Sequence, residues 1–435
     1  MNEQITGRTA AEIADSVREL HERGILAPGT LLPPVRELAE RLGVNRNTTV
    51  AAYRQLSQAG IVVSRGRAGT SIVEHDAVAQ EGYAADTVLR DIGTGNPDPA
   101  LIPDPSAVLA GVVGRPVLYG EPVIDPALDR WAREWIAPDM AASDFRITIT
   151  SGAVDAVERL LAQALMRDDA VALEDPCFLA SIHTVRLGGY RAIPVPVDDE
   201  GMTVEGLRAA LDAGVRAIIS TPRAQNPTGA TLSPARAAAL RGLLAQHPYV
   251  LIIEDDHFSL LSERAYESLI GPQHRRFALL RSVSKFLGPD MCLAIAATDP
   301  ETSDRLSMRL SPGTTWVSHL LQRLALGMLT SAGTHEGIRA AGAHYAERNR
   351  TFAERLRALQ IASEHLDGMN LWVRLPKPAR VVAERLMRRG WLVRTGDEFV
   401  LDESTAPSHH LRLTVHDLND ADAAQLAADI ASAVR

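Results

Sequence analysis

Hydrophobic residues near the start of the chain recur at the spacing of an amphipathic helix. Ile13, Val17 and Leu20 are separated by four and three positions, so they would line one face of a helix. Thr9 and Glu12 have the spacing of a capping box, which predicts that the helix begins just after Thr9. The chain therefore opens with a helix of about three turns that buries one side.

Two further helices are predicted directly downstream. Proline before residue 35 and glycine after residue 42 bound a short second helix. Asn45 is a good N-cap for a third helix, whose inward face we assign to Val50, Tyr53 and Leu56 and which we expect to end near Gly60.

Short β-branched runs follow these helices. Residues 61–63 and 70–73 predict two strands, and the glycine- and arginine-rich stretch between them predicts a turn. Three helices and a hairpin predict a winged helix-turn-helix over residues 1–74. Residues 75–90 are small and polar without periodicity, which indicates a linker.

The remainder of the chain alternates short apolar runs with helical stretches. Continuous apolar runs of this length are typical of strands in a mostly parallel sheet that helices cover on both faces. The predicted strands are residues 147–149, 170–173, 192–195, 217–220, 250–253, 277–280 and 293–296. We therefore predict an α/β domain over residues 91–435, with a small C-terminal α+β subdomain from about residue 330.

Composition narrows the class of protein only a little. The 435 residues, of which 46% are hydrophobic, are enough for two or more domains. Cys177 and Cys292 form neither a disulfide framework nor a metal-binding spacing, and no run of about 20 apolar residues could span a bilayer. We expect a cytoplasmic protein without a membrane segment or a bound metal.

Charge argues against a general binder of polyanions, because the formal net charge is −9. Residues 1–74 contain nine arginines and eight acidic residues, whereas the rest of the chain contains 36 basic and 46 acidic residues. If the first domain binds DNA, its affinity must come from the local placement of charge and from pairing two copies on a two-fold site.

Lysine is the scarcest charged residue in the chain, occurring at Lys285 and Lys377 alone. Arginine meets almost every other need for positive charge, but its guanidinium stays protonated and cannot form a Schiff base. Lys285 follows a predicted buried strand, so it is a candidate nucleophilic amine, whereas Lys377 lies between two prolines and is interpreted as a surface residue.

The turns that follow the predicted strands supply the rest of a candidate site, because ligands of parallel sheets bind at the carboxyl ends of the strands. Each turn taken singly also has a purely structural interpretation. Together they match the needs of pyridoxal 5′-phosphate (PLP), which are an amine, a carboxylate for the pyridine nitrogen, a donor to the phenolic oxygen, a stacking ring and a phosphate cradle. These roles are assigned in turn to Lys285, Asp255, Asn226, Phe178 and the turn of Ser151, Gly152 and Ala153, with Ser282 as a further phosphate ligand.

Residues 32–60 resemble the DNA-binding domain of the GntR family nearly end to end. The resemblance rests on the second helix, on the polar start of the third helix and on the hydrophobic residues that follow it. A polar helix start is also common on a solvated surface, and the whole pattern decides between the two. The resemblance implies that DNA is contacted by Arg36, Arg46, Asn47 and Thr48, and by the wing residues Arg65, Gly66 and Arg67.

From about residue 92 the chain resembles the fold-type I aminotransferases, on the motifs at residues 226–229 and 282–285. That resemblance implies that Tyr119 reaches the phosphate of a neighbouring subunit and that Arg412 binds a ligand carboxylate. A GntR-type domain fused to an aminotransferase-like domain is the architecture of the MocR family. It implies a head-to-tail homodimer that binds operator DNA and responds to PLP, or to an amine that reacts with PLP.

Two positions depart from the family's pattern. His257 stands where the family usually has a tyrosine that binds the phenolic oxygen, and Cys292 stands where related chains usually have an arginine that clamps the phosphate. Losing that bidentate contact costs roughly 1.5–3 kcal/mol, or one to two decades in affinity. We therefore expect weak, reversible PLP binding, which suits a sensor. The acidic and proline motifs of the pocket are similar to those of family members that govern vitamin B6 metabolism.

Three interpretations remain open on the sequence. The first is a regulator whose DNA binding responds to PLP through a Schiff base on Lys285. The second is a working aminotransferase with a DNA-binding appendage, since Lys285, Asp255, Asn226 and Arg412 are all present. The third is a DNA-binding protein whose second domain only dimerises.

Overall fold

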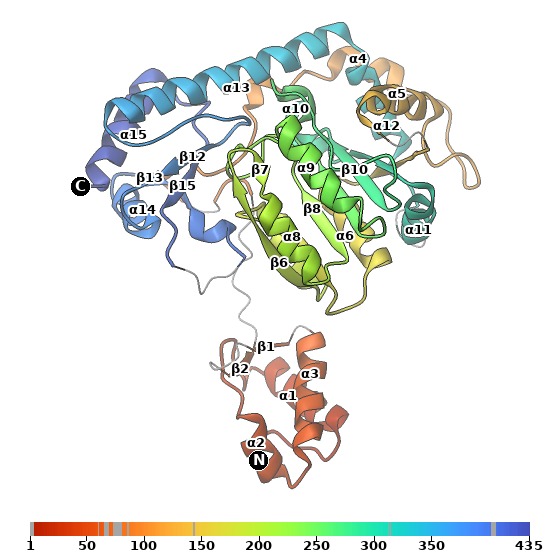
Figure 1. Ribbon diagram of the computed structural model, residues 1–435, viewed down its shortest axis with the longest axis vertical. Coiled ribbons are helices and arrows are strands. Elements are labelled where there is room, and N and C mark those ends of the chain that lie inside the picture. Colours follow the sequence, from red (N-terminus) through yellow and green to blue (C-terminus); the bar gives the residue numbers. More distant parts are fainter. Residues whose placement is uncertain are drawn as a thin grey trace. The chain divides into compact units, whose positions relative to one another are not determined.

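A computed structural model describes residues 4–59, 61–64, 69–72, 81–84, 87–141, 144–311, 313, 315–401 and 406–435 of the chain. The chain forms two compact units, Met1–Ala79 and Gln80–Arg435. Figure 1 shows the helices and strands of each unit.

The first unit is a winged helix-turn-helix, as predicted. Ile13, Val17 and Leu20 are buried in its core together with Leu38 and Leu56. Its elements are α1 (Ala10–Glu22), α2 (Val35–Leu42), α3 (Arg46–Gln58), and the hairpin of β1 (Val62–Ser64) and β2 (Thr70–Ile72). The described strands match the predicted runs to within one or two residues. The predicted end of α3 at Gly60 and the predicted wing turn through Arg65, Gly66 and Arg67 lie outside the described residues.

The predicted start of the first helix is confirmed, because α1 begins at Ala10 and the Thr9 hydroxyl accepts from the backbone N–H of Glu12 at 3.2 Å. The Glu12 carboxylate also accepts from the backbone N–H of Arg8 at 2.8 Å.

The prediction that Val50 faces inward was wrong. Val50 is 44% exposed, whereas Thr49 and Ala52 are fully buried. Helical spacing runs backward from Leu56 to Ala52 and Thr49, so the buried face includes a threonine that the hydrophobic pattern passed over.

The second unit is built on an eight-stranded sheet whose strands follow the order β4-β11-β10-β9-β8-β5-β6-β7. All seven predicted strands are present. The strands are β4 (Arg146–Thr150), β5 (Ala170–Asp175), β6 (Arg191–Asp198), β7 (Gly201–Met202), β8 (Ala217–Ser220), β9 (Leu251–Asp255), β10 (Phe277–Ser282) and β11 (Ala294–Thr298). The sheet is mostly parallel, but β11 runs antiparallel to both of its neighbours, β10 and β4.

Both faces of this sheet are buried, which explains why its strands are continuously apolar. Along β9, Ile252 packs into one hydrophobic cluster, whereas Leu251 and Ile253 pack into another on the opposite face. The first cluster includes residues of α5 (Pro126–Ile136), α8 (Val204–Asp212) and α9 (Pro234–Leu244), of which α8 and α9 lie in front of the sheet in Figure 1. The second includes residues of α6 (Ala153–Ala164), α7 (Leu179–Leu187) and α11 (Pro300–Leu310).

A second core is formed by the C-terminal part of this unit. Its three-stranded sheet has the order β12-β15-β14, and a separate short pair joins β13 to β3. The strands are β3 (Arg90–Asp91), β12 (Leu371–Arg374), β13 (Trp391–Leu392), β14 (Arg394–Thr395) and β15 (His410–Leu413), packed with α14 (Ala379–Met387) and α15 (Asp420–Ala433). The long helix α13 (Ala332–Ala358) contributes residues to both the main core and this one.

The helices in the described ranges include none with the length and apolar character needed to cross a membrane.

Candidate functional site

The predicted site residues follow strands that end at one edge of the main sheet. The register pairs Ser282 at the end of β10 with Ala294 of β11, which in turn pairs with Thr150 at the end of β4. Asp255 at the end of β9 pairs with Leu280 of β10. The turns after β4, β10 and β9 therefore open onto the same edge, where ligands of parallel sheets bind.

Lys285 lies in the short helix α10 (Ser284–Leu287), which begins two residues after β10. Its Nζ donates to the carbonyl oxygen of Gly95 at 2.6 Å. Burial lowers the pKa of the Lys285 amine below its ordinary value, although the carboxylates of Glu81 and Asp255 oppose this effect. A lower pKa increases the neutral, nucleophilic fraction of the amine at neutral pH.

Asp255 is the last residue of β9, and it is nearly fully buried. Its Oδ1 atom has no hydrogen-bond partner within the described part of the chain. Burial, and then the adjacent charge of Asp256, raises the pKa of Asp255 to about 7. A buried carboxylate oxygen without a donor fits a ligand that brings one, such as a protonated pyridine nitrogen.

The two acidic neighbours of Asp255 have structural partners. Asp256 accepts from Arg223 at 2.7 and 2.8 Å and from Arg281 at 2.9 Å. Burial opposes its ionisation, but these guanidinium groups outweigh burial and lower the pKa of Asp256. Glu254 accepts from the Tyr266 hydroxyl at 2.5 Å and from Ser268 at 2.8 Å. Unlike the acidic residues on either side, Asp255 thus has a carboxylate oxygen without a hydrogen-bond partner in the described part of the chain.

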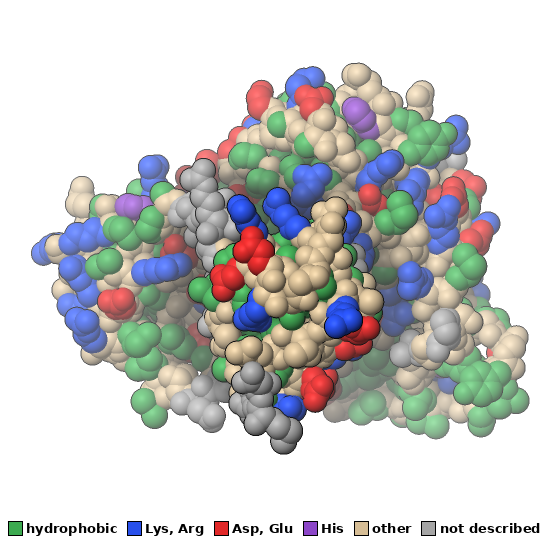
Figure 2. Space-filling view, turned by 90° about the horizontal axis from the view of Figure 1, so that it is seen from below, with side chains coloured by type: hydrophobic (Ala, Val, Ile, Leu, Met, Phe, Trp, Pro, Cys, Tyr) green, Lys and Arg blue, Asp and Glu red, His purple; other side chains and the backbone are tan. Residues whose placement is uncertain are grey.

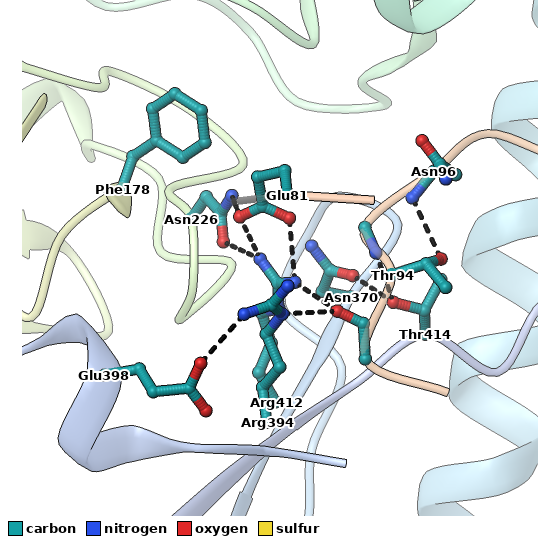
Figure 3. Close-up of polar contacts among 12 residues, drawn as sticks. Glu81, Thr94, Asn96, Phe178, Asn226, Asn370, Arg394, Glu398, Arg412 and Thr414 are labelled. Carbon is teal, nitrogen blue, oxygen red and sulfur yellow. Dashed lines mark hydrogen bonds and ion pairs between the residues drawn. The ribbon is translucent and has the colours of Figure 1, made fainter. Parts of the chain in front are cut away.

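Arg412 and Asn226 meet on the same side of the site (Figure 3). The Arg412 side chain, from β15, is fully buried, and one of its terminal nitrogens donates to the Asn226 side-chain oxygen at 3.0 Å. The guanidinium lies 4.9 Å from the centre of the Phe399 ring. Phe178, at the N-cap of α7, lies on the same side of Arg412 as Asn226 in Figure 3.

Glu81 joins this group, although nothing in the sequence around it predicts a place there. Its two carboxylate oxygens accept from the two terminal nitrogens of Arg412 at 2.5 and 2.8 Å, and one of them also accepts from Asn226 at 3.2 Å. Glu81 belongs to the segment interpreted as a linker, where an isolated acidic residue without periodicity carries no signal of a contact so distant in sequence.

His257 follows the two aspartates at the end of β9. Burial, and then the charge on Lys285, lowers the pKa of His257 to about 4. The imidazole is therefore neutral at pH 7, with one N–H donor and one acceptor.

The residues predicted to hold a phosphate form a second group at the start of α6. Gly152 is the N-cap of this helix with φ of +93°, and Ser151 precedes it. The Cys292 thiol lies 3.5 Å from the carbonyl oxygen of Ser151, so the cysteine does stand beside the predicted phosphate turn. The Ser282 hydroxyl donates to Ser284 at 3.1 Å, and Ala153 opens the helix.

Tyr119 lies apart from these groups on the surface. It is 88% exposed, and its ring centre is 5.4 Å from that of Trp316. Leu109, Val113 and Leu118 are also exposed large hydrophobic residues. Large hydrophobic side chains exposed along residues 109–119 fit a surface that another protein chain covers.

The predicted DNA-contacting residues in the described ranges are on the surface of the first unit. Arg46 and Asn47 are exposed at the start of α3, where Asn45 accepts from the N–H of Asn47 at 2.8 Å, and Thr48 is half-buried. The Arg36 side chain is 86% exposed and pairs with Glu40 at 3.2 Å. Figure 2 shows basic side chains interspersed with acidic ones on the face that it draws.

Two family matches cover most of the chain. Residues 9–72 match the family described as bacterial regulatory proteins, gntR family, and residues 117–430 match aminotransferase class I and II. The fold of the second unit is similar to that of a kynurenine aminotransferase from Pyrococcus horikoshii, with a TM-score of 0.72 at 20% identity over 80% of this chain and 91% of the other.

Two curated relatives are transcriptional regulators. The vitamin B6 salvage pathway transcriptional repressor PtsJ of Salmonella typhimurium is 47% identical over 99% of each chain. The pyridoxine biosynthesis transcriptional regulator PdxR of Corynebacterium glutamicum is 26% identical over 68% of each. This chain therefore belongs to the MocR-type transcriptional regulators, in which a gntR-type DNA-binding domain precedes an aminotransferase-like domain.

Proposed function

We propose that this regulator controls genes of vitamin B6 supply and senses PLP through a Schiff base on Lys285. The names of two relatives, a repressor of the salvage pathway and a regulator of pyridoxine biosynthesis, support the metabolic target. The more similar of the two is named a repressor, so we propose that this chain represses its target genes and that bound PLP changes its affinity for the operator.

The observation that carries the proposal is that Lys285 and Asp255 lie at the same edge of the main sheet. The amine has a lowered pKa, and the buried carboxylate has an oxygen without a donor in the described part of the chain. PLP, when bound, supplies an aldehyde that condenses with an amine and a ring that withdraws electrons. Lys285 would hold the aldehyde carbon, and Asp255 would keep the pyridine nitrogen protonated.

The remaining predicted residues complete the fit. Phe178 would stack on the ring, while Asn226 and the neutral His257 would donate to its phenolic oxygen. The phosphate cradle is assigned to Ser151, Gly152, Ala153 and Ser282, with the first N–H groups of α6. Cys292 supplies no positive charge there, so we expect PLP to bind reversibly, as a sensor requires.

The DNA-binding form is proposed to be a head-to-tail homodimer. The first unit is close to electrically neutral, so Arg36, Arg46, Asn47 and Thr48 from two copies would bind paired half-sites, with Arg65, Gly66 and Arg67 on the wings. The exposed apolar residues around Tyr119 support a partner subunit on that face, where Tyr119 would reach the partner's phosphate. Only a dimer brings that phenol to a cofactor.

Titration of operator binding with and without PLP tests the sensor. Parent protein should change its operator affinity when PLP is added, Lys285→Ala should not, and Lys377→Ala should behave like the parent. Lys377 is a matched control because it is the other lysine in the chain and contacts the C-terminal carbonyl of Arg435. If PLP shifts the affinity of Lys285→Ala as much as that of the parent, the proposal fails.

A working aminotransferase is the second candidate, favoured by the lowered pKa of Lys285 and by the buried Arg412, which could bind an acid. Sustained transfer of an amino group from an amino acid to a 2-oxo acid would establish it. A single turnover that stops would instead favour the sensor.

A further inference from the structure

Glu81 occupies Arg412 in the way that a ligand carboxylate would. Each carboxylate oxygen of Glu81 accepts from one of the two terminal guanidinium nitrogens of Arg412, at 2.5 and 2.8 Å. This is the bidentate geometry of carboxylate recognition. The Arg412 side chain is fully buried and that of Glu81 is 18% exposed. Burial opposes ionisation of Glu81, but the charge of Arg412 outweighs it and lowers the pKa of Glu81.

Glu81 also accepts a hydrogen bond from another residue that is assigned to the ligand. Asn226, the proposed donor to the phenolic oxygen, donates to Glu81 at 3.2 Å. A ligand that needs Asn226 and Arg412 together therefore competes with Glu81 for both.

Gly95 makes room for this contact. A Cβ atom at Gly95 would lie 2.3 Å from the Glu81 carboxylate, and the glycine has φ of +64°. The carbonyl of the same residue accepts from Lys285. The backbone at Gly95 is thus shaped around Glu81 on one side and the candidate nucleophile on the other.

In the described part of the chain, residues 81–84 make two backbone hydrogen bonds besides the contacts of the Glu81 side chain. Gly82 donates to the Thr94 carbonyl at 2.8 Å, and Ala84 donates to the Asp91 carboxylate at 2.8 Å. In sequence, eight residues separate Glu81 from Ile72, the last residue of β2 in the first unit. A change in the position of Glu81 would therefore act close to the covalent connection between the units.

We infer that Glu81 is an internal competitor for the ligand carboxylate. An amine effector that carries a carboxylate, such as an α-amino acid, binds Arg412 by displacing Glu81, and this frees residues 81–84 from the site. Glu81 thereby sets specificity, since an amine without a carboxylate cannot displace it. The inference rests on the proposed function for the identity of the ligand.

Chemical rescue tests the competition with neither PLP nor DNA. Full-length parent, Glu81→Ala and Glu81→Gln are titrated with propionate, a carboxylate without an amine, while thermal unfolding is followed. Propionate should stabilise both variants and bind them about tenfold or more tightly than the parent, because the internal carboxylate is gone. Glu200→Ala is the control, because the partner of Glu200, Arg236, keeps its contact with Asp198 at 2.8 Å. The control should bind propionate no better than the parent does.

The inference is overturned if propionate stabilises parent and variants equally, or stabilises none of them. Glu81→Gln keeps the size of the side chain, so it decides the case should Glu81→Ala not fold. A second arm titrates the PLP-loaded proteins with L-alanine and reads operator affinity, where Glu81→Gln should respond at lower amino acid concentration. If PLP does not bind, the proposed function fails, while the propionate arm still decides the role of Glu81.

Discussion

Arg281 and Arg412 are both buried in the second unit, but their carboxylate partners come from different kinds of segment. Arg281 donates to Asp256 at the end of β9 at 2.9 Å and to Asp139 after α5 at 2.5 Å, and it lies 4.8 Å from the centre of the Trp135 ring. Asp256 directly follows β9 of the main sheet, and Asp139 ends the short 3₁₀ turn Ala137–Asp139 that follows α5. Arg412 is neutralised by Glu81, which belongs to residues 81–84, and in the described part of the chain that segment makes two further backbone hydrogen bonds.

The difference separates a structural charge cluster from a binding subsite. A partner that is fixed in the sheet can leave only when the domain unfolds. A partner on a lightly held segment can exchange with a ligand that offers the same group. Asp255 is fixed in the sheet, but it belongs with the binding subsite, because it is buried at a strand end and its Oδ1 has no donor within the described part.

The largest effect is expected from breaking the structural cluster. Arg281→Met removes a buried cation, and Asp256 then has Arg223 as its remaining partner. We therefore expect a loss of about 3–5 kcal/mol in the free energy of unfolding. Urea denaturation measures it, and added propionate should not restore the loss. A change below about 1 kcal/mol would remove the contrast between the two arginines.

Asp255→Asn should have the opposite sign in the absence of PLP. The folded pKa of Asp255 is raised to about 7, so the folded state holds a proton that the unfolded state releases at lower pH. Stability is therefore lost as pH rises from the ordinary carboxyl range to about 7, and the amide avoids that loss. We expect Asp255→Asn to be more stable than the parent by roughly 2–4 kcal/mol at pH 8, although it binds PLP more weakly.

The matched control for this change is Asp256→Asn. Its folded pKa is lowered, so its contribution to stability is present above the ordinary carboxyl range and lost as pH falls. The control should be destabilised at pH 8, as judged by urea denaturation. Two variants that shift in the same direction would contradict the separation of the two neighbours.

A third arginine, introduced at position 292, would place a positive charge at the phosphate end of the site. Cys292→Arg should restore a charge-assisted contact and tighten PLP binding by about 1.5–3 kcal/mol, or one to two decades. Absorbance titration with PLP measures the constant, and Cys292→Ser controls for loss of the thiol. A parent that already binds PLP as tightly as Cys292→Arg does would argue against a weak sensor.

The smallest effect concerns the room left for Glu81. Gly95→Ala should cost about 1–2 kcal/mol, since alanine is strained at a φ of +64° and its Cβ would crowd Glu81. In the Glu81→Ala background the crowding disappears, so the cost of Gly95→Ala should be smaller there. Equal losses of stability in both backgrounds would show that Gly95 is needed only for its own backbone conformation and not to leave room for Glu81.

Much of the fold could be predicted because burial shapes the sequence locally. The seven predicted strands of the main sheet are present, since a sheet covered on both faces requires continuous apolar runs. The direction of β11 could not be predicted, because a short apolar run reads the same in either direction. The exposure of Val50 was missed because Thr49 and Ala52, which are weakly hydrophobic, complete the buried face of α3.

The site could be predicted only where it follows strands. Asp255 and Lys285 stand directly after apolar runs, so the topology of a parallel sheet brings them to one edge. Glu81 could not be found this way, because its contact with Arg412 joins residues that are 331 positions apart and the residues around Glu81 have no periodicity. Such a pairing is fixed by tertiary packing alone.

Lys285 is proposed to be the residue that holds PLP, and the small number of lysines makes this directly measurable. Full-length protein is incubated with PLP, reduced with borohydride and mapped by peptide mass spectrometry. We predict one stable pyridoxyl adduct on the peptide that contains Lys285, with Lys377 unmodified. An adduct on Lys377 or on the N-terminal amine instead, or no adduct at saturating PLP, would contradict the account.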